Sequence, residues 1–218
     1  MLYPRIPHLH GSAVREGDLQ LTDEETARVL ERAVRVYEKL DGLNVGFRFR
    51  GPGRLKILSR VHGELDPRDV GPELATLVSW AMRRLPRLWL LCEGTKHVAF
   101  GEWLGHRIGV HYRALPDLVL FFDVADARGR FVERVDMERR VRAAGLLQNP
   151  VVFAGRVRGA LERLGGKPPF GAREREGFVL TRGQERWKYV LQTHVRLRGR
   201  ELGRALNATE GPGAPCEV

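Results

Sequence analysis

The stretch that decides the fold is "VRVYEKLDGLNVGFRFRGPGRLKILSRV", residues 34–61. Three segments in it, VRVYEK, NVGFRFR and LKILSRV, alternate apolar and polar residues with the period of two that is typical of half-buried strands. Two turn signals separate the segments, Asp41-Gly42 and Gly51-Pro52-Gly53. Lys39 is therefore expected at the end of a strand, just before a tight turn.

Helical and extended patterns continue on both sides of this stretch. A helix is predicted to begin at the capping box of Thr22 and Glu25 and to fade soon after Val34. Further helices are predicted over 71–85, 136–147 and 154–165, and further strands over 97–105, 117–124, 130–135, 177–182 and 186–190. We expect an α+β domain of antiparallel sheets with helices on their outer faces. Residues 1–200 are assigned to this domain and 201–218 to a flexible C-terminal tail.

The composition is that of a globular protein with a basic excess. Of the 218 residues, 43% are hydrophobic and 29% are charged, which excludes a disordered chain. The formal net charge of +10 favours nucleic acid or a phosphorylated ligand as a partner, although arginine enrichment for solubility or heat resistance is an alternative. The N-terminus lacks a signal-peptide pattern, the apolar runs are too short to span a membrane, and only two cysteines occur. A cytoplasmic protein without membrane contact is expected.

Several common catalytic motifs do not occur in the sequence. It contains no HExxH, no GxSxG and no pair of CxxC motifs, which excludes the usual zinc-protease, serine-hydrolase and zinc-ribbon patterns. The segment LGGKP at Lys167 lacks the first glycine and the final Ser or Thr of a phosphate-binding loop. His8 and His10 form an isolated HxH in a loop, which is more often a surface feature than a metal site.

Charged residues recur at the ends of the predicted strands. In chain order they are Lys39 with Asp41-Gly42, Ser59-Arg60, Glu102, Asp123, Glu176 and Lys188. Each alone is most simply a solvated surface charge, and a K-x-D-G string arises readily by chance. The set is harder to dismiss, because its members stand in apolar segments such as AFGEWL, LFFDV and EGFVL, where an unpaired charge is costly. These residues therefore predict a lined cleft.

The order of these residues resembles that of the ATP-dependent RNA ligases, a branch of the covalent nucleotidyltransferase superfamily that also contains DNA ligases and mRNA capping enzymes. Lys39-Leu40-Asp41-Gly42 is similar to the nucleophile motif of that superfamily, and Ser59-Arg60 to the element downstream of it. FGEWL with Glu102 resembles the third motif, LFFDV the aromatic-bearing strand after it, and EGFVL with Glu176 and RWKYV with Lys188 the fourth and fifth. The resemblance covers residues 3–195 and implies a nucleotidyltransferase (ATP-grasp-like) domain.

One position distinguishes the branches of the superfamily. DNA ligases and capping enzymes usually carry Arg five residues after the nucleophilic lysine, whereas RNA ligases that seal nicks carry Asn, and here the residue is Asn44. The fifth motif departs from the usual pattern, because Arg186 stands where its first lysine is expected. No OB-fold domain is expected, because thirty residues follow Lys188.

The resemblance implies ATP and Mg²⁺ (or Mn²⁺) as cofactors and assigns roles to named residues. Lys39 is the expected nucleophile, Glu176 the metal-side acid and Lys188 a phosphate contact and catalytic residue. The expected nucleotide-binding residues are Glu38, Asp41, Gly42, Asn44, Arg60, Glu102, Phe122 and Arg186. Phe122, or Phe121 on the opposite face of the strand, is expected to stack on adenine, since strand alternation allows only one of them to face the pocket. The pKa of Lys39 is expected to be lowered by desolvation and by the positive charge of a metal ion and Lys188.

The expected function is the joining of RNA, possibly DNA, ends that carry a 3′-hydroxyl and a 5′-phosphate. The reaction would pass through a lysyl-AMP intermediate and a 5′-adenylylated strand. Alternatives are a GTP-using capping-type nucleotidyltransferase, a DNA ligase, and a non-catalytic basic protein that binds nucleic acid through its backbone phosphates.

Overall fold

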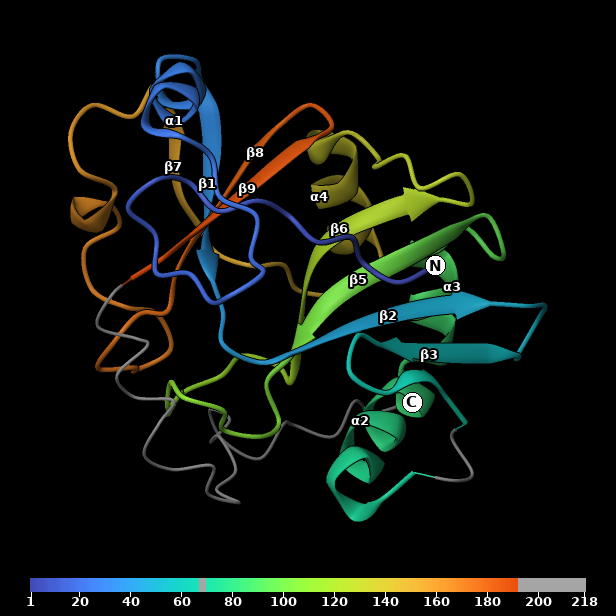
Figure 1. Ribbon diagram of the computed structural model, residues 1–218. Helices are drawn as coiled ribbons and strands as arrows, with labels where there is room; N and C mark the ends of the chain where they lie inside the picture. Colours follow the sequence, from blue (N-terminus) through green and yellow to red (C-terminus); the bar gives the residue numbers. More distant parts are fainter. Residues whose placement is uncertain (67–69, 192–218) are drawn as a thin grey trace.

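The computed structural model describes residues 1–66 and 70–191, which form two antiparallel sheets (Figure 1). Sheet A has four strands in the order β7-β1-β8-β9, and sheet B has five in the order β4-β3-β2-β5-β6. The strands of sheet A are β1 (Val34–Lys39), β7 (Val151–Gly155), β8 (Gly177–Arg182) and β9 (Glu185–Val190). Those of sheet B are β2 (Leu43–Phe49), β3 (Leu55–Ser59), β4 (Gly63–Leu65), β5 (His97–Trp103) and β6 (Val119–Asp126). Both sheets are open, and the described residues contain no closed barrel.

The Asp41-Gly42 turn carries the chain from one sheet to the other instead of closing a hairpin. β1 pairs with β7 and β8, whereas β2 pairs with β3 and β5. A side chain at Gly42 would have no room, because its Cβ would lie 2.5 Å from the carbonyl oxygen of Trp103 and 2.8 Å from Cδ2 of Leu104. Glycine is thus required where the crossing chain passes against the end of β5. This crossing places Lys39, the last residue of β1, at the junction of the two sheets.

Helices cover one face of sheet B and the outside of sheet A. Helices α2 (Pro72–Arg83), α3 (Leu85–Leu91) and α4 (Arg134–Ala143) pack on sheet B, and α1 (Asp23–Leu30) packs on sheet A. The largest core cluster joins Leu77, Trp80 and Ala81 of α2 to Phe47 of β2 and Phe121 of β6. The spacing of the three α2 residues gives that helix one apolar stripe, which faces the sheet. This arrangement leaves the other face of sheet B free to line a site.

The N-terminal segment runs along the edge of sheet A and across sheet B. The amide of Lys188 donates to the carbonyl of Pro7 at 3.0 Å, and the amide of Leu9 donates to the carbonyl of Lys188 at 2.9 Å. Tyr3 packs edge-on against Phe122, with 5.0 Å between ring centroids. The segment therefore braces a residue of each sheet, Lys188 and Phe122, from the outside.

Most of the predicted elements are confirmed. The capping box is present, since Thr22 Oγ1 accepts from the Glu25 amide and the Glu25 carboxylate accepts from the Thr22 amide. The strands predicted from residues 34–61 all form, although the third ends at Ser59. The helix after the capping box ends at Leu30, earlier than expected, and α3, β4 and β7 were not predicted. The predicted tail, 201–218, lies outside the described residues.

Two predictions are wrong. Residues 130–135 do not form a strand: Phe131 makes only an isolated bridge with Ala125, and α4 begins at Arg134. Residues 154–165 do not form a helix, because the first two belong to β7 and the only helical turn is a 3₁₀ turn at Leu161–Arg163. Gly155 and Gly159 take φ values of 142° and 92°, which no right-handed helix allows, and pairing with β1 decides the conformation of β7. No helix in the described part of the chain has the length and apolar character needed to cross a bilayer.

Candidate active site

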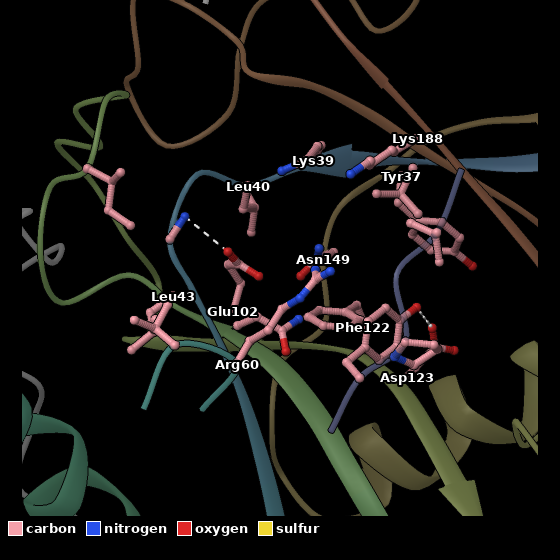
Figure 2. Close-up of a pocket in the computed structure, with 18 of the residues that line it drawn as sticks. Tyr37, Lys39, Leu40, Leu43, Arg60, Glu102, Phe122, Asp123, Asn149 and Lys188 are labelled. Atoms are coloured by element: carbon pink, nitrogen blue, oxygen red, sulfur yellow. Dashed lines mark hydrogen bonds between the residues drawn. The ribbon is translucent and has the colours of Figure 1, made fainter. Parts of the chain in front are cut away.

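A cavity of about 350 Å³ lies between the two sheets (Figure 2). Sheet A contributes Tyr37, Lys39, Val179 and Lys188 to its wall, and sheet B contributes Leu43, Asn44, Glu102, Phe122 and Asp123. Its other described lining residues lie in the N-terminal segment, in segments between strands or in α4, and they are Tyr3, Pro4, Ile6, Leu40, Gly42, Arg60, Val61, Ile108, Arg134 and Asn149. The site thus unites residues that are far apart in sequence, seven of which were predicted as site residues: Lys39, Gly42, Asn44, Arg60, Glu102, Phe122 and Lys188.

Lys39 enters the cavity paired with a buried carboxylate. Its Nζ atom lies 2.6 Å from Oε2 of Glu176, whose side chain is only 4% exposed, while that of Lys39 is 22% exposed. The two residues meet because Lys39 of β1 stands opposite Gly177, the first residue of β8. The position of Glu176 immediately before β8 therefore brings its carboxylate to the end of β1.

The charge state of Lys39 depends on the groups around its amine. Burial lowers the pKa of its amine, but the carboxylates of Glu176, Glu102 and Asp41 raise it by more, so that the net shift is upward from the ordinary value. The expected lowering includes the charge of a bound metal ion, and for that state it stays a prediction. In the protein without bound ions the amine is therefore protonated. It could act as a nucleophile only after the negative charge around it is reduced or neutralised.

Glu102 lies on β5 and holds the Asp41-Gly42 turn. Its Oε1 accepts a hydrogen bond from the Gly42 amide at 3.1 Å (Figure 2). Burial raises the pKa of Glu102 to about 8; nearby Lys39 lowers it, and the Glu176 and Asp41 carboxylates raise it further. Asn44 stands directly across from Glu102 in the β2–β5 pairing, so the two side chains line the same stretch of the cavity. Near neutral pH, Glu102 is poised between an acceptor and a donor of hydrogen bonds.

Asp41 is buried, and two hydrogen bonds of this residue fix the turn. Its Oδ2 accepts from the amide of Val110 at 2.8 Å, and its own amide donates to the hydroxyl oxygen of Tyr112 at 2.8 Å. Asp41 is not among the described lining residues of the cavity. Its carboxylate acts on Lys39 through its charge and orders the backbone at the nucleophile motif.

Lys188 and Arg60 add positive charge beside Lys39. The pKa of Lys188 is lowered, first by burial and then by the charges of Lys39 and Arg60, against the opposing effect of Asp18 and Glu176. Arg60 is held at the end of β3 by a turn in which Ser59 Oγ accepts from the amides of Val61 and His62, each at 3.3 Å. Such a group of cations in a partly buried wall suits the phosphates of a nucleotide.

The two neighbouring phenylalanines of β6 have separate environments. Phe121 is fully buried in the core between Phe47 and Trp80, with centroid distances of 5.8 and 6.4 Å. Phe122 points to the opposite face and lines the cavity. Of the two, Phe122 is therefore the one placed to stack on a base.

Two predicted nucleotide-binding residues, Glu38 and Arg186, form buried ion pairs. Glu38 lies on the reverse face of β1 from Lys39, where it accepts from Arg175 Nε at 2.9 Å. Arg186 is buried and forms a bidentate ion pair with Asp123. Its Nε donates to Oδ2 at 3.1 Å, and its Nη2 donates to Oδ1 at 2.9 Å. Neither side chain is among the described lining residues of the cavity. Strand alternation turns Glu38 away from the cavity, and Arg186 is paired with Asp123, so a direct nucleotide contact by either side chain stays a prediction.

The lining residues that the sequence analysis missed include Tyr37, Arg134 and Asn149. Tyr37 lies two residues before Lys39 on the same face of β1, and Arg134 stacks over its ring at 4.6 Å from the centroid. The period-two pattern of β1 could have identified Tyr37. Arg134 and Asn149 could not be found in this way, because they come from a helix end and from the segment before β7.

The side chains at the cavity suit a divalent cation only when a nucleotide supplies further ligands. No group of three or more His, Cys, Asp or Glu side chains that could hold a metal ion occurs in the part of the chain that the structure describes. The carboxylate of Glu176 is nevertheless buried beside the lining residue Lys39, although Glu176 is not itself among the described lining residues. Mg²⁺ is commonly held by one or two carboxylates together with substrate phosphates and water, and Glu176 fits that mode.

Comparison with protein families gives a match over most of the chain. A family model described as RNA ligase matches residues 32–195, most of the chain. No curated protein sequence matches the chain.

Solved structures with similar folds include three of Naegleria gruberi RNA ligase. A lysine-to-methionine variant with AMP and Mn has a TM-score of 0.58 at 14% identity, over 89% of this chain and 62% of that one. A lysine-to-alanine variant with ATP and Mn scores 0.56 at 14% identity, over 92% and 63%. An aspartate-to-alanine variant in the apo state scores 0.57 at 14% identity, over 81% and 54%. The fold is thus the nucleotidyltransferase fold, and the chain spans between 54% and 63% of the length of these three proteins.

Proposed function

Because the chain belongs to the RNA ligase family, we propose that it joins RNA ends through a covalent lysyl-AMP intermediate on Lys39. The observation that carries this proposal is the place of Lys39, at a strand end in a cavity with Glu176 at 2.6 Å and with Arg60 and Lys188 in the wall. We further propose that residues 1–200 form the adenylyltransferase domain. The Naegleria structures with ATP, AMP and Mn support ATP and a divalent cation as cofactors.

In the first step, the neutral amine of Lys39 attacks the α-phosphorus of ATP. A nitrogen–phosphorus bond forms, the bond from phosphorus to the bridging oxygen breaks, and pyrophosphate leaves. Lys188 and Arg60 contact the phosphates and offset the charge that develops on them. The pair with Glu176 keeps Lys39 protonated, so this pairing must weaken and the ammonium group must lose its proton to solvent before the attack.

A divalent cation bound by Glu176 and the nucleotide phosphates would supply positive charge that lowers the pKa of the amine and neutralises the phosphates. The remaining work falls to the protein. Phe122 stacks on the base, Glu102 and Asn44 line the position expected for the ribose, and Asp41 and Gly42 hold the turn that aims Lys39.

In the second and third steps, AMP passes from Lys39 to a 5′-phosphate, and a 3′-hydroxyl then attacks the adenylylated end and releases AMP. Covalent capture divides one difficult joining reaction into easier transfers. The net charge of +10 favours binding of the polynucleotide.

A labelling experiment tests the first step. The protein is incubated with α-³²P-labelled ATP or GTP and Mg²⁺ or Mn²⁺, and then run on a denaturing gel. We expect a covalent label from ATP that is lost in Lys39→Ala. Label from GTP alone would favour a capping-type transferase, and the absence of label from either nucleotide would favour a non-catalytic nucleic-acid binder.

The choice between RNA and DNA rests on Asn44, whose side chain lines the cavity across from Glu102. A protein can tell RNA from DNA through the 2′-hydroxyl. We expect faster sealing of nicks with an RNA 3′-hydroxyl strand than of all-DNA nicks. Equal rates on both would contradict this choice of branch.

A further inference from the structure

Asn149 connects the two sheets at the wall of the cavity. Its backbone amide donates to the carbonyl of Phe121 on β6 at 3.0 Å, and its side-chain Nδ2 donates to the carbonyl of Glu38 on β1 at 3.4 Å. The residue is only 5% exposed. Asn149 is thus held between the strand that carries Phe122 and the strand that carries Lys39.

The other atom of this amide has no partner. Asn149 Oδ1 is buried and makes no hydrogen bond in the described part of the chain, although the residue lines the cavity (Figure 2). The carbonyl of Glu38 fixes which way the amide points, because turning the amide over would set Oδ1 against that carbonyl, acceptor to acceptor. A buried acceptor without a donor is costly, and such an atom in a native site calls for an explanation.

A ligand that supplies a hydrogen-bond donor explains this atom. Phe122 lines the same cavity, and the backbone amide of Asn149 donates to the carbonyl of the residue just before Phe122. A purine with an amino group at position 6 presents a donor at its edge, whereas one with an oxygen at that position presents an acceptor. Only the former satisfies Oδ1.

We infer that Asn149 recognises the 6-amino group of the purine ring that stacks on Phe122, and thereby selects adenine over guanine. This inference rests on the proposed function, whose nucleotide it specifies. The 6-oxygen of guanine would face Oδ1 and leave two acceptors in contact without a proton between them. A site built to bond an amino group rejects analogues that lack it.

The test compares nucleotides that differ only at position 6. The rate of Lys39 labelling is measured with ATP and with purine riboside 5′-triphosphate, which has hydrogen in place of the amino group. We expect kcat/KM for ATP to exceed that for the analogue by about tenfold or more in the wild-type protein. In Asn149→Ala this ratio should fall towards one, mainly through a loss on ATP, and discrimination against GTP should weaken in parallel.

Gln148 provides the matched control. It carries the same kind of amide one residue earlier, and its Oε1 is also buried without a hydrogen bond in the described part of the chain, but it is not among the described lining residues. Gln148→Ala should keep the wild-type ratio. Asn149→Ser is a second variant, and thermal melts establish that each variant folds.

Two results would overturn the inference: a wild-type ratio near one, which needs no variant, or an unchanged ratio in Asn149→Ala or Asn149→Ser. Failure of the proposed function is distinguishable, because it would abolish labelling by every nucleotide in the wild-type protein. In that case, displacement of a fluorescent ribose-labelled ATP by ATP or by the purine analogue measures the same ratio through binding. Equal displacement by both would then overturn the role of Asn149.

Discussion

Lys39 Nζ lies 2.6 Å from Glu176 Oε2, at the point where the chain leaves sheet A for sheet B. This pair keeps the nucleophile of the proposed reaction in its unreactive, protonated form. Glu176 is also the proposed ligand of the divalent cation. Metal binding and deprotonation of Lys39 are therefore coupled through one carboxylate. Glu176 cannot pair fully with the ammonium group while it binds a metal ion.

Replacing Glu176 should change the pKa of Lys39 in the metal-free protein. Burial lowers this pKa and Glu176 opposes it, so Glu176→Gln should shift the pKa downward. The measurement is the pH dependence of Lys39 acetylation by acetic anhydride, followed by mass spectrometry. Glu185→Gln, at a carboxylate that is 56% exposed, is the matched control. An unchanged titration midpoint in Glu176→Gln would contradict the coupling.

Lys39→Ala should abolish AMP labelling while leaving the last step intact. Alanine has no nucleophile, whereas the sealing of a strand that already carries 5′-AMP does not need the lysine amine. The measurement compares labelling by ATP with sealing of a preadenylylated RNA nick. Lys96→Ala, at an exposed lysine outside the cavity, should behave as wild type in both assays. Undiminished labelling in Lys39→Ala would remove this residue from the mechanism.

Lys188→Ala should lose adenylylation without losing the fold. Its side chain faces the cavity beside Lys39, while its backbone holds the N-terminal segment through bonds that alanine can also make. Removing one group that stabilises transition-state charge typically costs about 10²–10³ in rate. Single-turnover labelling gives the rate, and a thermal melt gives the stability. A variant that no longer melts cooperatively would assign Lys188 a structural role.

Glu102 should make the stability of the protein depend on pH. Its pKa is about 8 in the folded protein against 4.5 for an unperturbed glutamate, so the folded state holds a proton that the unfolded chain releases between these values. Raising the pH through this window therefore destabilises the fold. Glu102→Gln stays neutral and keeps an acceptor for the Gly42 amide. Its Tm relative to wild type should rise by about 3 °C or more between about pH 5 and pH 9, without metal or nucleotide. A difference in Tm that does not vary with pH would contradict this assignment.

The strands around Lys39 could be predicted from the sequence because apolar and polar residues alternate along them. In β2 and β3 one face packs on α2 and α3, so the pattern records the core directly. The segment 154–165 could not be predicted in this way. Its conformation is decided by the pairing of β7 with β1, which is more than a hundred residues away along the chain and leaves no local signal.

The residues of the site also divide into those that could be predicted from the sequence and those that could not. Lys39, Asn44, Glu102 and Lys188 lie at or near strand ends and carry recognisable motifs, and all four meet in the cavity. Glu38 and Arg186 share those motifs, yet their side chains are taken up by Arg175 and Asp123. Asn149 has no motif at all, because its role depends on the distance between two sheets.

Salt should separate the binding of polynucleotide from the binding of ATP. ATP is held in a cavity by a few groups, whereas a polynucleotide is gripped through several phosphates with release of counterions, so that its affinity falls as a power of salt concentration. The excess charge of +10 is available for that grip. Raising monovalent salt from about 50 to 200 mM should weaken end joining by about tenfold or more, and should change formation of the Lys39 adenylate only a few-fold. Labelling and sealing of a preadenylylated RNA nick, measured across the same salt series, check this. If both fall in parallel, the basic surface does not bind the polynucleotide, and its arginines serve stability or another partner.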